Sequence, residues 1–293
     1  GSPKMTMAIN IVGAVVNTIL DALFVFGFRW GMTGAAAATV IGQVVAAAMV
    51  VWYLYHYKTV QLQKNAFLLD KEVVLQVMSL GAAPCFNQLA MMLVQVVMNR
   101  TLKYYGGLSA YGESIPIACS GIIAKVSMLV MSFVIGISQG LQPIVSYNYG
   151  AKKYERVKKA YFLAIRSAAV ICVVSSVLFQ VFPRQIISVF GNGSELYFDF
   201  GENFFRKYLF FMFLCFMQPI SANFFTAIGK PKKGIFMSLT RQIIFLLPLL
   251  IVLPIFMGID GVMYAGPVAD LVATVVCTVL VVKEMRRPEF IGK

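Results

Sequence analysis

The chain has 293 residues, of which 59% are hydrophobic and only 13% are charged, and its mean hydropathy is +0.80. This composition lies outside the range of soluble globular proteins, so we expect lipid to surround most of the chain. The net charge of +13 resides mainly in short loops between apolar runs, which favours an explanation by membrane topology over nucleic-acid binding.

Eight membrane-spanning helices are predicted. Strand-like alternation is absent, and a helix satisfies its own backbone groups inside a bilayer, so the fold class is an all-α polytopic membrane protein. The spans cover roughly residues 5–28, 33–57, 73–99, 113–140, 158–182, 203–228, 235–257 and 262–284. The five cysteines stand alone in apolar runs and the chain has one histidine, which excludes a disulfide framework and a recognisable zinc site.

The first span has a counterpart late in the chain. The first span begins at Gly1-Ser2-Pro3-Lys4 and ends at Gly31-Met32-Thr33-Gly34. The later span begins at Gly229-Lys230-Pro231-Lys232 and ends at Gly258-Ile259-Asp260-Gly261. The two frames are about 228 residues apart and nearly equal in length. This pattern predicts an internal repeat of the kind found in secondary transporters with duplicated halves.

A polar stripe follows the first span. Thr6, Asn10, Asn17 and Asp21 fall within about 60° of one another on a helix. A carboxylate in hydrocarbon costs at least about 3 kcal/mol, so Asp21 should face a bundle interior or a cavity, with Asn17 one turn away. We therefore expect Asp21 to be an ion-coupling residue; the alternative is a protonated aspartate that only forms a hydrogen bond.

The polar linker at residues 58–72 divides the chain into two parts. Residues 1–57 supply two helices and residues 73–293 supply six. Duplicated halves should be equal, so the sequence predicts that about 160 residues and four helices precede Gly1 in the native protein. On this hypothesis, residues 1–57 end a first lobe and residues 73–293 form a complete second lobe.

Further polar residues lie in the second part. Gln88, Gln95 and Asn99 form a stripe that suits either a cavity wall or hydrogen bonds between helices. Glu113 suits either a membrane interface or a cavity, and Lys125, near the middle of its span, should face a cavity or pair with an acid. Residues 183–193 predict a short interfacial helix, and the Phe-rich stretch at 198–225 predicts a lipid-facing or cavity-lining helix.

A loop motif carries a family resemblance. Residues 136–153 read G-I-S-Q-G-L-Q-P-I-V-S-Y-N-Y-G-A-K-K, and Gly-Ala-Ala-Pro at 81–84, Tyr-Tyr-Gly-Gly at 104–107 and the two G-x-P-K loops accompany this motif. Together they resemble the multidrug and toxic compound extrusion (MATE) family across the whole chain. The resemblance implies a twelve-helix transporter with two six-helix lobes, of which this chain matches the last two helices of the first lobe and all of the second.

The resemblance also implies site residues. In one branch of the family an Asn and an Asp one turn apart, with a Thr on the next helix, form a polar pocket that Asn17, Asp21 and Thr39 match. Other branches use acids of the second lobe, but Glu113, Glu202 and Asp270 do not align with that site. The candidates for a substrate cavity are Asn10, Gln88, Gln95, Glu113, Lys125 and Asp270; Asp270 could instead bond Thr274 one turn away.

The basic residues predict the topology. Sixteen lysines and arginines fall on one side of the predicted spans and four on the other. Because cytoplasmic loops carry the excess of basic residues, we expect both ends of the chain and the 58–72 linker to be cytoplasmic, in the plasma membrane.

The resulting functional hypothesis is secondary active multidrug efflux. The expected partners are the lipid bilayer and amphipathic, often cationic small molecules, exchanged for a proton or Na⁺ by a protein that is monomeric at full length. No cofactor is expected, and no metal other than Na⁺ at Asp21. The alternative is a lipid-linked precursor flippase, which needs a cationic cavity that only Lys125, Arg166 and Arg241 could form. The alternative outside transport is a membrane-embedded enzyme, but the sequence contains no catalytic motif of such an enzyme.

Overall fold

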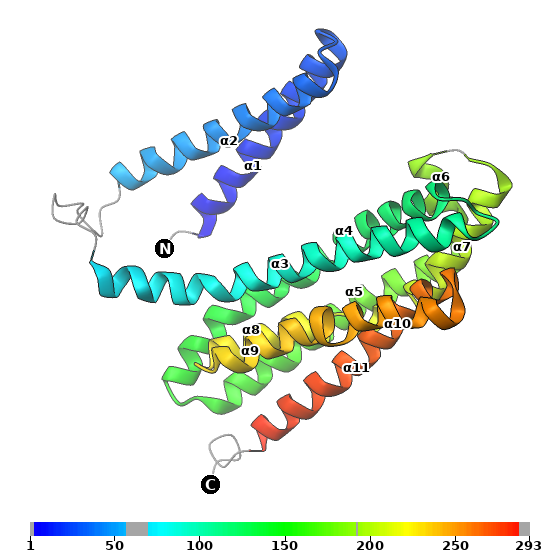
Figure 1. Ribbon diagram of the computed structural model, residues 1–293. Helices are drawn as coiled ribbons and strands as arrows, with labels where there is room; N and C mark the ends of the chain where they lie inside the picture. Colours follow the sequence, from blue (N-terminus) through cyan, green and yellow to red (C-terminus); the bar gives the residue numbers. More distant parts are fainter. Residues whose placement is uncertain (1–2, 57–69, 192, 287–293) are drawn as a thin grey trace. The chain divides into compact units, whose positions relative to one another are not determined.

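The computed structural model describes residues 3–56, 70–191 and 193–286, and all the regular structure in these ranges is helical (Figure 1). The α-helices are α1 (Pro3–Asp21), α2 (Gly31–Tyr55), α3 (Lys71–Gly107), α4 (Ser114–Gly150), α5 (Tyr154–Val181), α6 (Pro183–Phe190), α7 (Glu195–Tyr208), α8 (Met217–Ala227), α9 (Pro231–Leu239), α10 (Leu247–Met257) and α11 (Ile259–Met285). Two π-helical segments, η1 (Ala22–Gly27) and η4 (Thr240–Leu246), and a 3₁₀ turn, η3 (Met212–Leu214), complete the set.

Seven helical segments are long and apolar enough to cross a membrane. They are Lys4–Gly27, Gly31–Tyr55, Ser114–Gly150, Tyr154–Val181, Glu195–Ala227, Pro231–Met257 and Ile259–Met285. Each corresponds to one of the predicted spans, so the chain is a multi-pass membrane protein. The remaining predicted span, 73–99, lies within α3, a continuous helix of 37 residues. The predicted linker at 58–72 lies almost wholly outside the described residues.

The chain divides into two compact units, Gly1–Val77 and Met78–Lys293. In the first unit, α1 and η1 pack against α2 as a helical hairpin. Small residues permit this approach, since a Cβ on Gly42 would lie 3.0 Å from both the Asn17 Cβ and the Gly13 carbonyl oxygen. Close helix contact through glycine is typical of membrane proteins.

The glycines of the predicted repeat occupy matching places in two hairpins. Gly31, the first residue of α2, and Gly258, directly before α11, both have positive φ, +56° and +60°, a conformation that glycine adopts without steric cost. Three residues later, a Cβ on Gly34 would lie 3.1 Å from the Phe24 backbone, and one on Gly261 would lie 2.5 Å from the Leu253 backbone. Both copies therefore share a glycine with positive φ at the turn and a close glycine contact three residues later.

The second unit is a bundle in which α4 packs against α5 and α8, and α11 packs against α10. Its core contains five fully buried phenylalanines, Phe200, Phe204, Phe205, Phe224 and Phe225. The prediction that the Phe-rich stretch faces lipid or a cavity is therefore wrong for these rings. Aromatic side chains bury more apolar area than aliphatic ones, and these pack edge to face, as Phe224 and Phe225 do at 5.7 Å.

The span Glu195–Ala227 is interrupted near its middle. Helix α7 ends at Tyr208 and α8 begins at Met217, with η3 between them. Pro219 provides a physical reason, because its ring has no N–H to bond the Cys215 carbonyl and clashes with it in a regular helix. The sequence predicted one membrane-spanning helix at 203–228; the structure begins this span at Glu195 and divides it into α7 and α8.

The short helix α6 ends before Gly191, as predicted for residues 183–193. Two ion pairs join α6 to α7: the Arg184 guanidinium lies 2.7 Å from a carboxylate oxygen of Glu195 and 3.4 Å from a carboxylate oxygen of Glu202. The hydrogen bond that Arg184 donates to the Glu195 carboxylate is the main cause that raises the pKa of Arg184 above its ordinary value.

Candidate functional site

Asp21 is the last residue of α1, at the point where the helix widens into the π-helical segment η1. π-Helical segments occur frequently at functional sites. The Asp21 Oδ1 atom is buried and has no hydrogen-bond partner within the described part of the chain. A buried carboxylate oxygen without a partner in an apolar span is a place for a proton or a small cation.

Asn17 and Thr39 bring α1 and α2 together one turn before Asp21. The Asn17 Nδ2 donates to the Thr39 Oγ1 at 3.4 Å, and that hydroxyl donates to the Ala35 carbonyl at 2.9 Å. The contact between Asn17 and Thr39 unites two of the three residues of the predicted pocket. Asn10, further along the stripe, has an exposed side chain.

A second polar cluster lies around Asp270 on α11. The Arg241 Nε in η4 donates to Asp270 Oδ1, and the Cys215 Sγ donates to Asp270 Oδ2 at 3.4 Å. Asp270 is only 6% exposed. The suggested bond to Thr274 is wrong, because a guanidinium offers a charge-assisted hydrogen bond, which is stronger than one from a hydroxyl.

Arg241 and Cys215 were not predicted from the sequence as partners of Asp270. The available signal was that an arginine within an apolar span must have a partner or face water. Which acid it meets depends on the register between η4 and α11, and sequence spacing does not give that register.

The remaining candidates lie apart from both clusters. The Gln95 Nε2 donates to the Asn99 Oδ1 at 3.1 Å along α3, and Gln88 is exposed on the same helix. Of the two expectations for this stripe, neither describes the Gln95 bond, which stays within one helix. Lys125 is exposed on α4, and no described acid lies within ion-pair distance of it.

Glu113 lies at the start of α4, where it is 3.5 Å from the Lys103 ammonium, and both side chains are more than half exposed. The two residues line a cavity of about 530 Å³ whose other lining residues are Arg100, Tyr104, Gly107 and Leu108. Three of the side chains that line this cavity, those of Arg100, Lys103 and Glu113, are therefore charged.

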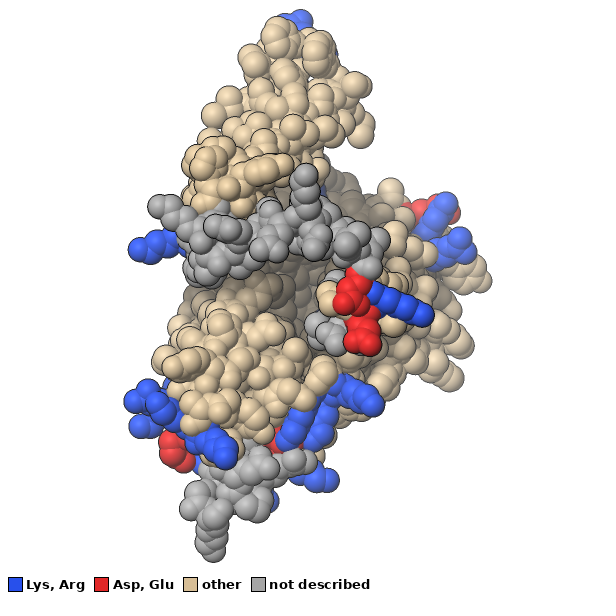
Figure 2. Space-filling view, turned by 90° about the vertical axis from the view of Figure 1, so that its left-hand side faces the viewer, with Lys and Arg blue, Asp and Glu red and all other residues tan. Residues whose placement is uncertain are grey.

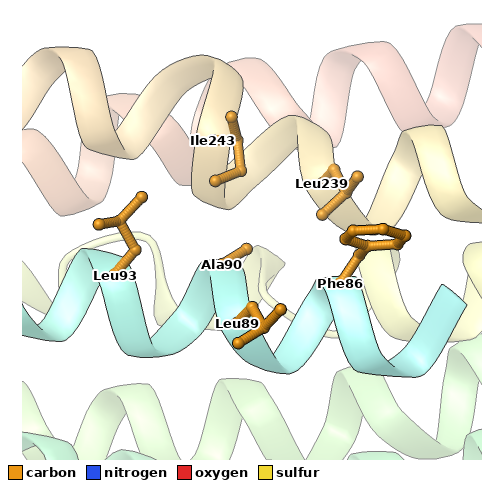
Figure 3. A pocket seen from close by; sticks show the side chains of 6 residues that line it. All are labelled: Phe86, Leu89, Ala90, Leu93, Leu239 and Ile243. Carbon is orange, nitrogen blue, oxygen red and sulfur yellow. The ribbon is translucent and has the colours of Figure 1, made fainter. Parts of the chain in front are cut away.

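The cavity beside η4 is apolar and has a volume of about 240 Å³. Figure 3 shows its six lining side chains between α3 and the α9–η4 segment. These are Phe86, Leu89, Ala90 and Leu93 from α3, Leu239 from α9 and Ile243 from η4. None of the predicted site residues lines this cavity, although Ile243 and Arg241 belong to the same π-helical segment.

The surface has the charge distribution of a membrane protein. On the face in Figure 2, uncharged side chains cover broad continuous areas and Lys and Arg gather in a few groups. Within the second unit, the basic side chains of Lys230 and Lys233 both bond Glu284, near the end of α11.

Comparison with known proteins identifies the family to which the chain belongs. The family model described as MatE matches residues 84–252, more than half of the chain. The chain belongs to the MatE family. The MATE resemblance of the loop motifs is thereby confirmed, and membership places this MatE chain among membrane transporters rather than enzymes.

Several relatives and solved structures extend across nearly all of this MatE chain. The multidrug export protein MepA of Staphylococcus saprophyticus is 22% identical over 282 residues, which is 96% of this chain and 60% of that protein. MepA of Staphylococcus aureus is 21% identical, over 92% of this chain and 58% of its own length. This MatE chain therefore spans about three fifths of the length of these relatives.

The fold agrees with two solved transporters. A MOP superfamily transporter from Pyrococcus furiosus has a TM-score of 0.82 and 20% identity, over 94% of this chain and 61% of the other. An outward-facing multidrug resistance MATE family transporter of the same superfamily also has a TM-score of 0.82 and 20% identity, over 94% of this chain and 60% of its own. At this level of identity, the likeness establishes the fold of the MatE chain.

Proposed function

We propose that the native protein containing this sequence is a secondary active multidrug efflux transporter that exchanges a proton or Na⁺ for amphipathic, often cationic molecules by alternating access. The similarity to the multidrug export protein MepA supports this substrate class. In this proposal α3 is an eighth span, residues 1–57 belong to a first lobe, and residues 73–293 form the second lobe in the plasma membrane.

We place the ion-coupling site at Asp21, with Asn17 and Thr39 as its neighbours. The observation that carries this assignment is the buried Asp21 Oδ1, which has no partner in the described structure. A carboxyl group in that position changes charge as a cavity opens to one side of the membrane and then to the other. The bound ion and a cationic substrate then compete for the same carboxylate.

The test is dye efflux by the native gene product in vesicles, with a pH gradient and an Na⁺ gradient imposed separately. Asp21→Asn keeps the shape of the side chain but removes its titratable charge. We expect it to reduce gradient-driven efflux at least about tenfold while leaving membrane insertion near wild type.

The matched control is Asp199→Asn, which makes the same chemical change at an exposed position on α7 and should retain efflux. Efflux by Asp21→Asn with intact ion dependence would contradict the assignment of the coupling site. Equal dye retention by the wild type under both gradients and under neither would contradict the antiport function itself.

The flippase alternative has less support. A site for a lipid-linked pyrophosphate requires several unpaired cations around one cavity. Of the three candidate cations, Arg241 is paired with Asp270, whereas Lys125 and Arg166 are exposed on different helices.

A further inference from the structure

The Arg241–Asp270 ion pair lies where two irregular segments meet a helix that contains a proline. Arg241 belongs to the π-helical segment η4, Cys215 to the interruption between α7 and α8, and Asp270 follows the in-helix proline Pro267 by three residues. All three segments belong to candidate membrane spans. Helices with interrupted hydrogen bonding are the places where transporters form their ion and substrate sites.

Few other titratable groups face this carboxylate. From the elements packed against α11, they are Arg241 in η4, Cys215 after η3 and Tyr208 in α7, with Cys172 of α5 next to Cys215. Helix α10 has no charged residue, and α8 has none. Arg241 is therefore the only permanent charge among the described groups around Asp270.

The two charges depend on each other. While the pair is closed, Arg241 neutralises the Asp270 carboxylate, and the Cys215 thiol bonds its second oxygen. If η4 moved away from α11, Asp270 would be a buried carboxylate without a cation. Such a group becomes neutral by taking up a proton, because an isolated buried charge costs more than protonation does.

We propose that Arg241 and Asp270 form a proton-exchange site in the second unit, in which opening of the ion pair and protonation of Asp270 occur together. One proton passes from water to the Asp270 carboxylate when the pair opens, and returns to water when Arg241 closes on it again. This inference rests on the proposed transport function, but it does not depend on the role of Asp21.

The packing around the pair allows such a movement on one side and resists it on the other. Gly266, one turn before Asp270, lies so close to Tyr208 that a Cβ would be 2.6 Å from the ring, which fixes α11 against α7. Where η4 faces α3, the apolar cavity of about 240 Å³ next to Ile243 leaves room for the segment to shift (Figure 3). Arg241 is thus on the element with space to move.

The test uses the native gene product in proteoliposomes and the double variant Arg241→Gln/Asp270→Asn. Replacing both charges leaves no unpaired ion, so this variant should fold even if Asp270→Asn alone does not. We expect normal downhill dye equilibration, at least about a tenfold loss of accumulation driven by a pH gradient, and no proton release when substrate is added.

The matched control is Lys207→Gln/Asp260→Asn. It removes an ion pair of 2.6 Å between α7 and α11, which shares helix α11 with the Arg241–Asp270 pair but is more exposed. It should retain proton release and gradient-driven accumulation.

Two results would overturn the proposal. Accumulation by the Arg241→Gln/Asp270→Asn variant at the wild-type level would show that the pair serves only stability. Loss of downhill equilibration as well, or misfolding of the doubly neutral variant, would show that it supports the fold rather than the coupling. A wild type that moves no dye under any gradient would instead refute the proposed function.

Discussion

The buried acids of α11 are both paired with bases from other elements. Asp270 is paired with Arg241, and Glu284, which is 1% exposed, is paired with Lys230 and Lys233. Asp21 differs, because its buried oxygen has no described partner. This difference separates a carboxylate that is satisfied in the observed state from one that is available to an ion.

Substitution of Glu284 should destabilise the second unit. Glu284→Gln leaves the ammonium groups of Lys230 and Lys233 without their carboxylate, and it unties the α8–α9 loop from the end of α11. Breaking a buried pair costs about 3–5 kcal/mol, which partial exposure of both lysines reduces to about 1–3 kcal/mol.

Thermal unfolding in detergent measures this cost. The control is Glu155→Gln, which removes an exposed i,i+3 pair with Lys158 and should change stability by less than about 0.5 kcal/mol. Equal unfolding temperatures for the two variants would contradict the structural role of Glu284.

The residues that make up the Asp21 and Asp270 clusters could be predicted only in part from the sequence. Spacing alone places Asn17 one turn before Asp21, because both lie on one helix. The Arg241–Asp270 pair joins residues 29 positions apart on different helices, so it depends on how η4 and α11 align. Nothing in the local sequence determines that alignment.

At the scale of the elements, hydropathy located the apolar spans because a bilayer demands about 20 apolar residues from each helix. Hydropathy did not locate the interruption between Tyr208 and Met217 or the two π-helical segments. Each of the three lies within a longer span that is apolar on average, so hydropathy averaged over the span does not reveal the change in the backbone. Proline at 219 was visible, but prolines are also found in continuous membrane helices, such as Pro143 in α4.

Glycines at close contacts between helices should contribute more to stability than glycines elsewhere. Gly261→Ala places a Cβ 2.5 Å from the backbone of Leu253, so α10 must move away from α11. Overpacking of this kind costs about 1–3 kcal/mol, and we expect a lower unfolding temperature.

The matched variant is Gly140→Ala on α4, where a Cβ has no neighbour within 4 Å. It should be neutral or slightly stabilising, because alanine favours a helix more than glycine does. If Gly261→Ala were as stable as Gly140→Ala, the contact between α10 and α11 would be looser than described.

At the scale of the whole molecule, the orientation in the membrane can be tested at two exposed lysines. Lys153 lies between α4 and α5, and Lys232 lies in the first turn of α9. The charge bias of the loops predicts that both are cytoplasmic. A cysteine at either position should react with an impermeant thiol reagent only after the cells are permeabilised.

The native cysteines allow this experiment with one further change. Among the cysteines of this sequence, Cys119, Cys172 and Cys277 are buried and Cys215 is half-buried, so the exposed Cys85 is the one to replace by alanine. A cysteine introduced at Phe190, at the exposed end of α6 on the predicted outer side, should react in intact cells. Labelling from outside at Lys153 or Lys232 would reverse the predicted orientation or change the number of spans.

The short turns between η1 and α2 and between α10 and α11 have a consequence for biosynthesis. Only residues 28–30 separate η1 from α2, and Gly258 alone separates α10 from α11. A turn of this length cannot reach across a bilayer of about 30 Å, so the second helix of each pair cannot wait in the aqueous phase while the first one inserts. Each hairpin should therefore leave the translocation channel as one unit, after its second helix has been synthesised.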